Sequence, residues 1–531
     1  MPEGFARLGR RTGVRTQPPA DRLSSRTIWS APARLAPREE IAQWNRRNAP
    51  LLSLYGLEIA SVVVLPLRAA SPGAGPAGPL QAELRDRLLL AGIMGALAVS
   101  MAGRGDLLDV DPRQRDRIKK AVKENNDRNS TAAMTEALYA LCAADPDLSL
   151  RVAIGEGARL KPGEKGGNPT LYAGQSIGAG SRRCMVAVDT VEGTTKSTLF
   201  DHSCGTLLHV TQAPILSIPD VYFDKCQLAG ISSVSVSDPL ERIVEAVMDE
   251  KATREINLFA LERPRHPIEK MLALGANMRT DTDGDAYPVV AAGLSFGVFP
   301  DNMRALDGVC GNVGGAAEMV ASAAGAAYLG VRSTARFCAS KIQSWEARYD
   351  LSREDEAVIR EHGLDPARMY SIDDLVPGLR EADGAFVACA ITDNWHIPGL
   401  DAALVGDNFA TVCGLFVGAA GTAKIYRITF SFTRPRTETA REITPLLTRL
   451  LAHSESDIGA AVRQAVADPA RSGRLRREIA TSFYMHITNR EDLASETTPM
   501  ALDLSAASKV EPAGTMALLR ALEAAAPGWF K

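Results

Sequence analysis

The stretch Met185-Val-Ala-Val-Asp-Thr-Val-Glu-Gly-Thr-Thr195 decides the fold and points to the chemistry of this chain. Its first four residues are apolar and predict a buried strand that ends in an acid. A second acid follows three residues after the first. A tight turn would bring the carboxylates of Asp189 and Glu192 and the carbonyl of Val191 to one point. Hard divalent cations prefer such clusters of oxygen atoms.

The residues after the second acid predict the start of a helix. Gly193 and Thr194 would open it, and the free N–H groups of a helix start can hold a phosphate. The hydroxyl of Thr194 is placed to bond a metal-bound water. The alternative is structural, since Asp189 or Thr194 could simply cap the helix.

Two further acids stand in comparable positions. Glu156 lies between two glycines directly after the apolar run Arg151–Ile154, and Glu318 follows Gly314 and Gly315 at the start of a helical stretch that runs to Ala327. Glycine permits unusual backbone angles and the close approach of a ligand. Taken alone, the segment around Glu156 could be a simple turn. Glu318 could be present only because an acid interacts favourably with the start of a helix.

Composition excludes several classes of protein. The chain has 531 residues, is 46% hydrophobic and carries a net charge of −3, so it can bury a sizeable core and is not globally disordered. The balanced charge and the 5% aromatic content give no case for nucleic acid as a partner. The longest apolar runs, Ile59–Leu67 and Leu88–Val99, are shorter than the roughly 20 residues of a membrane span. The eight cysteines are scattered without a C-x-x-C pair, which indicates reduced thiols and a cytoplasmic protein.

Strand-like and helical runs alternate along the chain, which predicts an α/β fold. The predicted strands are Ile59–Leu65, Arg151–Ile154, Met185–Val188, Leu207–Val210, Ile256–Leu261, Ala385–Ile391 and Lys424–Phe432. The predicted helices are 80–101, 113–142, Ile268–Gly275, Ala316–Ala327 and Thr444–His453.

The ends of the chain differ in composition from its centre. Residues 1–38 are rich in Arg, Ser, Pro and Gly, which predicts a flexible arm or, alternatively, an organellar transit peptide. Residues 39–84 form an N-terminal extension that ends in the linker-like segment Ser71–Pro79. Residues 85–436 are predicted to be the catalytic region, and residues 437–531 a mostly helical extension.

Taken together, the three acidic segments resemble a known family. The pattern of a strand, then Asp-x-x-Glu-Gly-Thr, with a Gly-Glu acid upstream and a helix-start acid downstream, is similar to that of the class II fructose-1,6-bisphosphatases, within the lithium-sensitive, metal-dependent sugar phosphatase superfamily. Three more segments resemble this family in order and spacing: Pro219–Lys225 with its Tyr, Arg263-Pro-Arg-His266, and Asp281-Thr-Asp-Gly-Asp285. The resemblance covers residues 85–436 and implies a layered α-β-α-β-α sugar-phosphatase fold, here with N- and C-terminal extensions.

The resemblance also implies roles for individual residues. The metal ligands would be Glu156, Asp189, the carbonyl of Val191, Glu192 and Glu318. The substrate-binding residues would be Gly193, Tyr222, Arg265, His266, Asp283 and Asp285. The catalytic residues would be Thr194, which orients the attacking water, together with Lys123 and Asp127, which fit the family's pair of a Lys and an Asp four residues later. The alternative for the last two is an ordinary charged pair on one helical face.

The sequence departs from the family pattern in two places near these residues. Lys123 is separated from the turn Gly103–Asp106 by an inserted stretch, whereas the family's Lys follows that turn directly. Thr190 stands where the family has Pro, which predicts a looser turn but removes no ligand.

These features predict a phosphoric monoester hydrolase that acts on a sugar bisphosphate, either fructose 1,6-bisphosphate or sedoheptulose 1,7-bisphosphate. Two or three Mg²⁺ or Mn²⁺ ions would activate a water molecule for attack on phosphorus. One alternative is a phosphatase for a modified sugar or a nucleoside phosphate in specialised metabolism. The other is a non-catalytic protein that binds sugar phosphates. Because homo-oligomers are common in the family, we expect one here, with no nucleic-acid or membrane partner.

Overall fold

The computed structural model describes residues 32–68, 77–102, 104–107, 110–155, 171, 173–219, 221–295, 305–339, 342, 344–443, 446, 450, 458–469, 471–473, 475, 521–522 and 524–526. Several sequence predictions fall wholly or mainly outside these residues: the arm before residue 32, most of the segment Ser71–Pro79, Glu156, and most of the helix Thr444–His453.

The larger of two sheets in the described part of the chain has ten strands, in the order β1-β2-β16-β15-β13-β6-β5-β3-β4, with β14 paired to β15. Their bounds are β1 (Arg34–Leu35), β2 (Leu57–Arg68), β16 (Ala423–Phe432), β15 (Phe409–Gly418), β13 (Gly384–Ala390), β6 (Gly205–Thr211), β5 (Arg182–Glu192), β3 (Leu148–Gly155), β4 (Ser176–Ile177) and β14 (Leu404–Val405). The neighbours β3 and β5 are parallel, whereas β5 and β6 are antiparallel, so the sheet is mixed.

The second sheet has six strands in the order β12-β11-β7-β10-β8-β9. Their bounds are β12 (Met369–Ser371), β11 (Val331–Cys338), β7 (Tyr222–Ala229), β10 (Gly308–Gly315), β8 (Asn257–Leu261) and β9 (Asn277–Asp281). The neighbours β8 and β9 are parallel, so the loops that follow them leave the same edge of the sheet.

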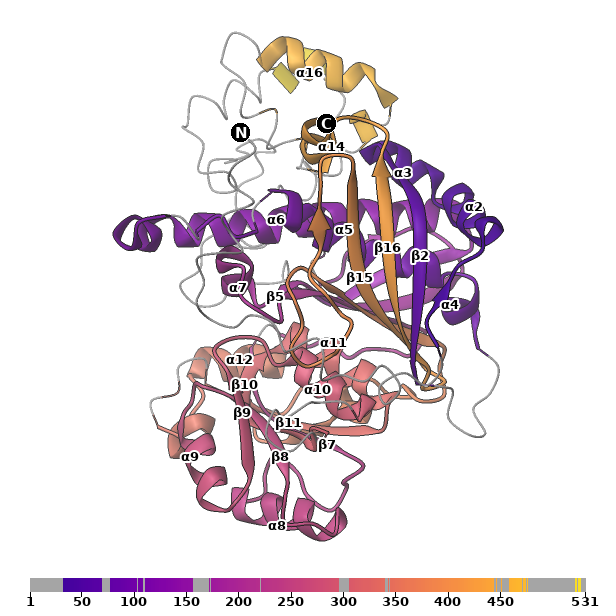
Figure 1. The fold of residues 1–531 in the computed structure, drawn as a ribbon. Coiled ribbons are helices and arrows are strands. Elements are labelled where there is room, and N and C mark those ends of the chain that lie inside the picture. Colours follow the sequence, from indigo (N-terminus) through magenta and orange to yellow (C-terminus); the bar gives the residue numbers. More distant parts are fainter. Residues whose placement is uncertain are drawn as a thin grey trace.

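Helices cover both sheets and also fill the space between them (Figure 1). On one face of the larger sheet lie α5 (Arg85–Ala102) and α6 (Pro112–Ala144), preceded by the short α4 (Pro79–Ala82). Between the sheets lie α10 (Ala286–Leu294) and α11 (Ala316–Ala327), and α11 contacts strands of both. The outer face of the smaller sheet carries α8 (Leu240–Glu250) and α9 (His266–Ala273). These five layers are the α-β-α-β-α arrangement that the family resemblance implied.

Shorter elements complete the described structure. They are α2 (Arg38–Arg47), α3 (Ala49–Tyr55), α7 (Thr194–Leu199), the 3-10 helix η2 (Glu346–Tyr349), α12 (Arg353–Glu361), α13 (Ile372–Leu375), α14 (Arg436–Ile443) and α16 (Ile458–Ala467). No helix among the described residues is both long enough and apolar enough to cross a membrane.

The seven predicted strands are all confirmed, as are the predicted helices other than Thr444–His453. The predicted strand at Ile59 is part of β2, which pairs with β16 along its whole length. This N-terminal segment is therefore an integral part of the larger sheet. The strands β7, β9, β10, β11 and β15 were not predicted.

The layer between the sheets packs closely enough to require glycine on α11. A Cβ on Gly325 would lie 2.4 Å from Cγ of the buried Phe386 on β13. We therefore expect Gly325→Ala to lower the free energy of unfolding by about 1–3 kcal/mol, although Ala favours helix. Gly459 of α16 is the matched control, because its added Cβ would meet only an Arg463 nitrogen at 3.5 Å. Denaturant titration would contradict this account if both variants were equally stable.

Candidate metal and phosphate site

Three acids predicted as metal ligands lie together at the junction of the two sheets. Asp189 and Glu192 come from β5 and Glu318 from the first turn of α11, and each offers a carboxylate oxygen within 4.8 Å of the others. Asp189 and Glu192 are each 2% exposed. The N–H of Gly315 donates to Oε1 of Glu318 at 2.8 Å, which fixes that side chain at the start of the helix.

A β-bulge explains why the two acids of β5 share a face. In a regular strand, residues three apart point to opposite faces of the sheet. Here Asp189 pairs with Leu207 of β6, whereas Glu192 pairs with Gly205, so three steps along β5 match two steps along β6. The extra residue on β5 returns Glu192 to the side of Asp189. This bulge is the tight turn that the sequence predicted.

Hydrogen bonds hold the bulge in place. The N–H of Val191 donates to Oδ1 of Asp189 at 3.0 Å, and the hydroxyl of Thr194 donates to the carbonyl of Val191 at 3.0 Å. From α6, Ser130 donates to the carbonyl of Thr190 at 2.6 Å, and the hydroxyls of Thr131 and Thr190 lie 2.9 Å apart. The turn that was expected to be looser with Thr190 is thus tied to α6.

Glu192 also contacts the loop that follows β9. Its Oε1 accepts the N–H of Ala286 at 3.0 Å. Gly284 has a φ of +76°, and a Cβ there would lie 3.2 Å from the same carboxylate oxygen. Burial, together with the charges of Glu318 and Asp285, raises the pKa of Glu192 well above its ordinary value. The acids therefore repel one another when no cation lies among them.

Asp285 is buried beside this cluster and bonded on both oxygens. Lys225 of β7 donates to it at 2.8 Å, and Nδ2 of Asn312 on β10 donates at 2.9 Å. The ammonium nitrogen of Lys225 also lies 3.7 Å from Oε1 of Glu318, and the lysine side chain has no exposed surface. Burial alone would lower the pKa of Lys225, but the carboxylates of Asp285 and Glu318 raise it overall. Asp283, two residues before Asp285, is half-buried.

Sequence reasoning missed Lys225 as a site residue. It stands in the segment quoted for Tyr222, and nothing in the sequence singles it out, because β7 also carries the polar residues Asp224 and Gln227. A buried lysine needs carboxylate partners, and those of Lys225, which are Asp285 and Glu318, lie 60 or more residues away in the sequence.

The remaining predicted residues lie around this cluster or apart from it. Gly193 takes the left-handed conformation, with φ of +77°, and precedes α7. Tyr222 starts β7 opposite Gly315, the residue before α11. Glu156 is outside the described residues, but Gly155, at the end of β3, pairs with Val188 of β5.

Arg265 and His266 occupy the start of α9, on the smaller sheet's outer layer. Arg265 is 76% exposed and bonds Glu269 at 3.0 Å. The ring of His266 stacks on Trp345 with centroids 6.0 Å apart. The structure gives neither residue a described contact with the acidic cluster, so their phosphate-binding role stays a prediction.

Lys123 and Asp127 lie on α6, which packs against α7. Asn126, next to Asp127, donates to the hydroxyl of Ser197 on α7 at 2.9 Å. This places the Lys–Asp pair on the helix that borders the Gly193–Thr194 turn. Their catalytic role stays a prediction.

A second buried charged network supports the loop that carries Asp283, and sequence reasoning missed it as well. Lys196 of α7 donates to Asp281 at 2.6 Å, and Nε2 of His202 lies 3.1 Å from the same Asp281 oxygen. Nδ1 of His202 lies 2.8 Å from Asp201. The imidazole also stacks on Trp395, with centroids 3.4 Å apart. Both ring nitrogens face carboxylates, an arrangement that suits the protonated imidazolium.

This network predicts a pH dependence of stability. Burial lowers the pKa of His202, but its bonds to Asp201 and Asp281 raise it overall above the ordinary value. The protonated His202 therefore stabilises the folded protein fully below pH about 6.5. This stabilisation disappears as the pH rises through the higher pKa of His202 in the folded state. Between pH 6 and pH 9, the melting temperature of the unaltered protein should fall by roughly 1–2 °C more than that of His202→Gln. Parallel pH profiles for the two proteins would contradict this assignment.

The layered α/β fold and its cluster of buried acids define a sugar-phosphatase type of protein. A family model described as "Bacterial fructose-1,6-bisphosphatase, glpX-encoded" matches residues 115–427, more than half of the chain. The chain belongs to this family of class II fructose-1,6-bisphosphatases. It is accordingly a metal-dependent phosphoric monoester hydrolase for sugar bisphosphates, a class of enzyme that serves gluconeogenesis. No curated protein matches the chain.

Proposed function

We propose that the chain hydrolyses the 1-phosphate of fructose 1,6-bisphosphate or of its near relative sedoheptulose 1,7-bisphosphate. The observation that carries this proposal is the gathering of Asp189, Glu192 and Glu318 beside the turn that holds Asp283 and Asp285. The first group offers the oxygens for metal. In the second, the half-buried Asp283 offers a carboxylate to sugar hydroxyls, and Lys225 and Asn312 hold Asp285 beside it. The family match supports the same assignment.

The donor set fits Mg²⁺ or Mn²⁺. All the clustered donors are carboxylate oxygens, the type that these hard cations prefer. Burial and the neighbouring carboxylates raise the pKa of Glu192, so a bound cation would stabilise the ionised form of the cluster. We propose two or three ions, held by Glu156, Asp189, the Val191 carbonyl, Glu192 and Glu318. When bound, they supply neutralisation of phosphoryl charge and a more acidic water.

The chain's own groups orient the reactants. The hydroxyl of Thr194 donates its proton to the Val191 carbonyl, so its oxygen is free to accept a hydrogen bond from the attacking water. Asp127 is proposed to help remove the proton of that water, with Lys123 beside it. The backbone of Gly193 and the side chains of Tyr222, Arg265, His266, Asp283 and Asp285 are proposed to hold the sugar and its two phosphates.

Release of inorganic phosphate tests this function. The purified chain should release phosphate from fructose 1,6-bisphosphate with Mg²⁺ or Mn²⁺ and none with EDTA. Sedoheptulose 1,7-bisphosphate, a nucleoside monophosphate and fructose 6-phosphate should be run in the same series. A preference of tenfold or more in kcat/KM for a compound outside the two bisphosphates would overturn the substrate proposal and leave the family assignment intact.

We further propose a cytoplasmic homo-oligomer. All eight cysteines are buried free thiols, as expected for a reducing compartment. Light scattering after size-exclusion chromatography measures the oligomeric state, and a monomer at micromolar concentration would contradict this part of the proposal.

A further inference from the structure

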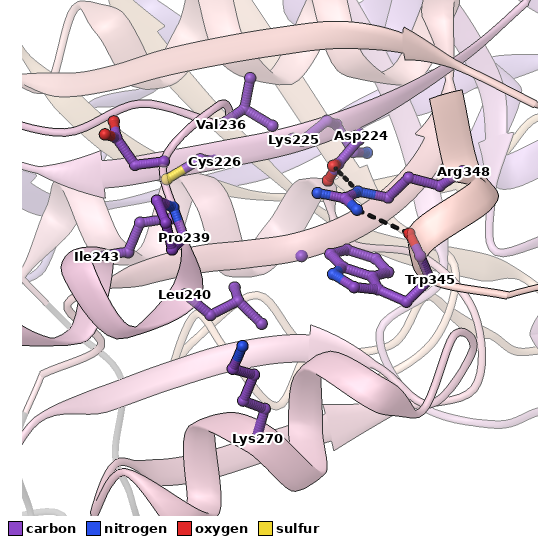
Figure 2. A pocket seen from close by; sticks show the side chains of 12 residues that line it. Asp224, Lys225, Cys226, Val236, Pro239, Leu240, Ile243, Lys270, Trp345 and Arg348 are labelled. Atoms are coloured by element: carbon purple, nitrogen blue, oxygen red, sulfur yellow. Dashed lines mark hydrogen bonds and ion pairs between the residues drawn. The ribbon is translucent and has the colours of Figure 1, made fainter. Parts of the chain in front are cut away.

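The turn that carries Asp283 is held at both of its ends by buried lysines. At the end after Asp283, Lys225 of β7 donates to Asp285 at 2.8 Å. Side chains alternate along a strand, so the preceding residue, Asp224, lies on the outer side of the smaller sheet, where Arg348 bonds it at 2.8 Å (Figure 2). Asp224 therefore does not compete with Asp285 for the ammonium of Lys225.

The end of the turn before Asp283 is fixed by Asp281, the last residue of β9. Its Oδ2 accepts from the ammonium of Lys196 at 2.6 Å and lies 3.1 Å from Nε2 of His202, while its Oδ1 accepts the N–H of Thr282 at 2.7 Å. Burial raises the pKa of Asp281, but its bonds to His202 and the charge of Lys196 lower it overall. Both oxygens of this carboxylate are thus engaged, and the backbone of the turn is tied to one of them.

Lys196 belongs to the turn for which we proposed phosphate binding. It stands on α7, three residues after Gly193, and its N–H donates to the Gly193 carbonyl at 2.9 Å. A lysine here could bind a phosphate directly, but its side chain is 1% exposed and its ammonium faces Asp281. A lysine this deeply buried needs a carboxylate partner, because its charge has lost the surrounding water. The ion pair therefore connects the Gly193–Thr194 turn to the turn of Asp283.

Asp283 itself remains available to a ligand. It is half-buried, and no group among the residues that the structure describes donates a hydrogen bond to it, in contrast to Asp281 and Asp285. The next residue, Gly284, has a φ of +76° and lies so close to Glu192 that an added Cβ would be 3.2 Å from Oε1. The position of Asp283 is thus set by its chain neighbours and not by a bond of its own.

We propose that Lys196 is a positioning residue for the sugar, because through Asp281 it holds Asp283 at a fixed place relative to the Gly193–Thr194 turn. This inference rests on the proposed function, in which Asp283 accepts from sugar hydroxyls. Hydrogen bonds weaken steeply when their geometry is lost, so a displaced carboxylate would bind the sugar poorly. Lys196 contacts Asp281 and not the acids of the metal cluster, so its loss should affect sugar binding and not phosphate binding.

Two partial ligands test this inference in Lys196→Met. Fructose 6-phosphate carries the sugar without the 1-phosphate, whereas inorganic phosphate carries no sugar. In calorimetric titrations with Mn²⁺, the variant should bind fructose 6-phosphate at least about tenfold more weakly than the unaltered chain, the loss expected for a hydrogen bond to a charged group. Its affinity for inorganic phosphate should stay the same. Lys251→Met, the same change on a lysine side chain that is 35% exposed, should alter neither affinity.

A double variant separates positioning from folding. Lys196→Met leaves Asp281 without its buried cation, which destabilises the fold, whereas adding Asp281→Asn removes the uncompensated charge and keeps an acceptor for the N–H of Thr282. The double variant should therefore regain stability in denaturant titration. It should still bind fructose 6-phosphate at least about tenfold more weakly, because the connection to α7 remains broken.

Three results would overturn the inference. They are unchanged affinity of Lys196→Met for fructose 6-phosphate, equal losses for fructose 6-phosphate and inorganic phosphate, and recovery of full sugar affinity together with stability in the double variant. Turnover of fructose 1,6-bisphosphate by the unaltered chain is measured in parallel. If that chain neither turns over the bisphosphate nor binds fructose 6-phosphate, the proposed function fails as well. Turnover together with any of the three results overturns the role of Lys196 alone.

Discussion

Replacing Asp189 by Asn should lower kcat for phosphate release at least about a hundredfold, since even residues that only hydrogen-bond to a metal ligand alter activity by roughly 10–100-fold. The amide keeps the size of the side chain and can still accept the N–H of Val191, which Asp189 accepts at 3.0 Å. The variant therefore removes charge and leaves the bulge in place. Initial rates over a series of Mn²⁺ concentrations would show whether the loss reflects weaker metal binding.

The same variant should be no less stable than the unaltered chain when metal is absent. Asp189 lies within 4.8 Å of two other acids, and removing its charge relieves their repulsion. The melting temperature in EDTA should stay equal or rise, whereas the stabilisation by Mn²⁺ should shrink. Asp249→Asn, the same change on an exposed residue of α8, is the control for both readouts. Retention of substantial activity in Asp189→Asn would contradict the assigned metal site.

The strands and acids of the site were predictable because their signals are local. An apolar run that ends in an acid predicts both the strand and the position of the carboxylate at its end, as at Met185–Asp189. The helix start at Glu318 is equally local, since glycines precede it. The family pattern then predicted that these distant segments serve one site, and the structure brings Asp189, Glu192 and Glu318 together.

The unpredicted features depend on partners far away in the sequence. The bulge on β5 is visible only in its register with β6, where Asp189 meets Leu207 and Glu192 meets Gly205. Lys225 and Asp285 are 60 residues apart, and they meet because Lys225 lies on β7 and Asp285 follows β9, a strand of the same sheet. The strands β10 and β11 carry glycines and charged residues that weaken the alternating pattern typical of strands.

Replacing Lys225 by Met should lower the free energy of unfolding by about 3–5 kcal/mol, because it leaves Asp285 as a buried charge without its cation. Asn312 would still donate to Asp285, at 2.9 Å, but an amide does not neutralise the carboxylate. Lys251→Met is the matched control, since its partner Asp307 lies 4.0 Å away and the lysine side chain is 35% exposed. That change should cost under about 1 kcal/mol. Equal stabilities of the two variants in denaturant titration would contradict the role given to Lys225.

A second substitution separates charge balance from catalysis. Adding Asp285→Asn to Lys225→Met removes the uncompensated carboxylate, so the double variant should regain part of the lost stability. It should not regain phosphatase activity, because Asp285 is a proposed substrate-binding residue and Lys225 lies 3.7 Å from Oε1 of Glu318. Recovery of both properties would show that Lys225 acts only through the fold. Recovery of stability alone would place the Lys225–Asp285 pair in the site, beside the proposed metal ligand Glu318.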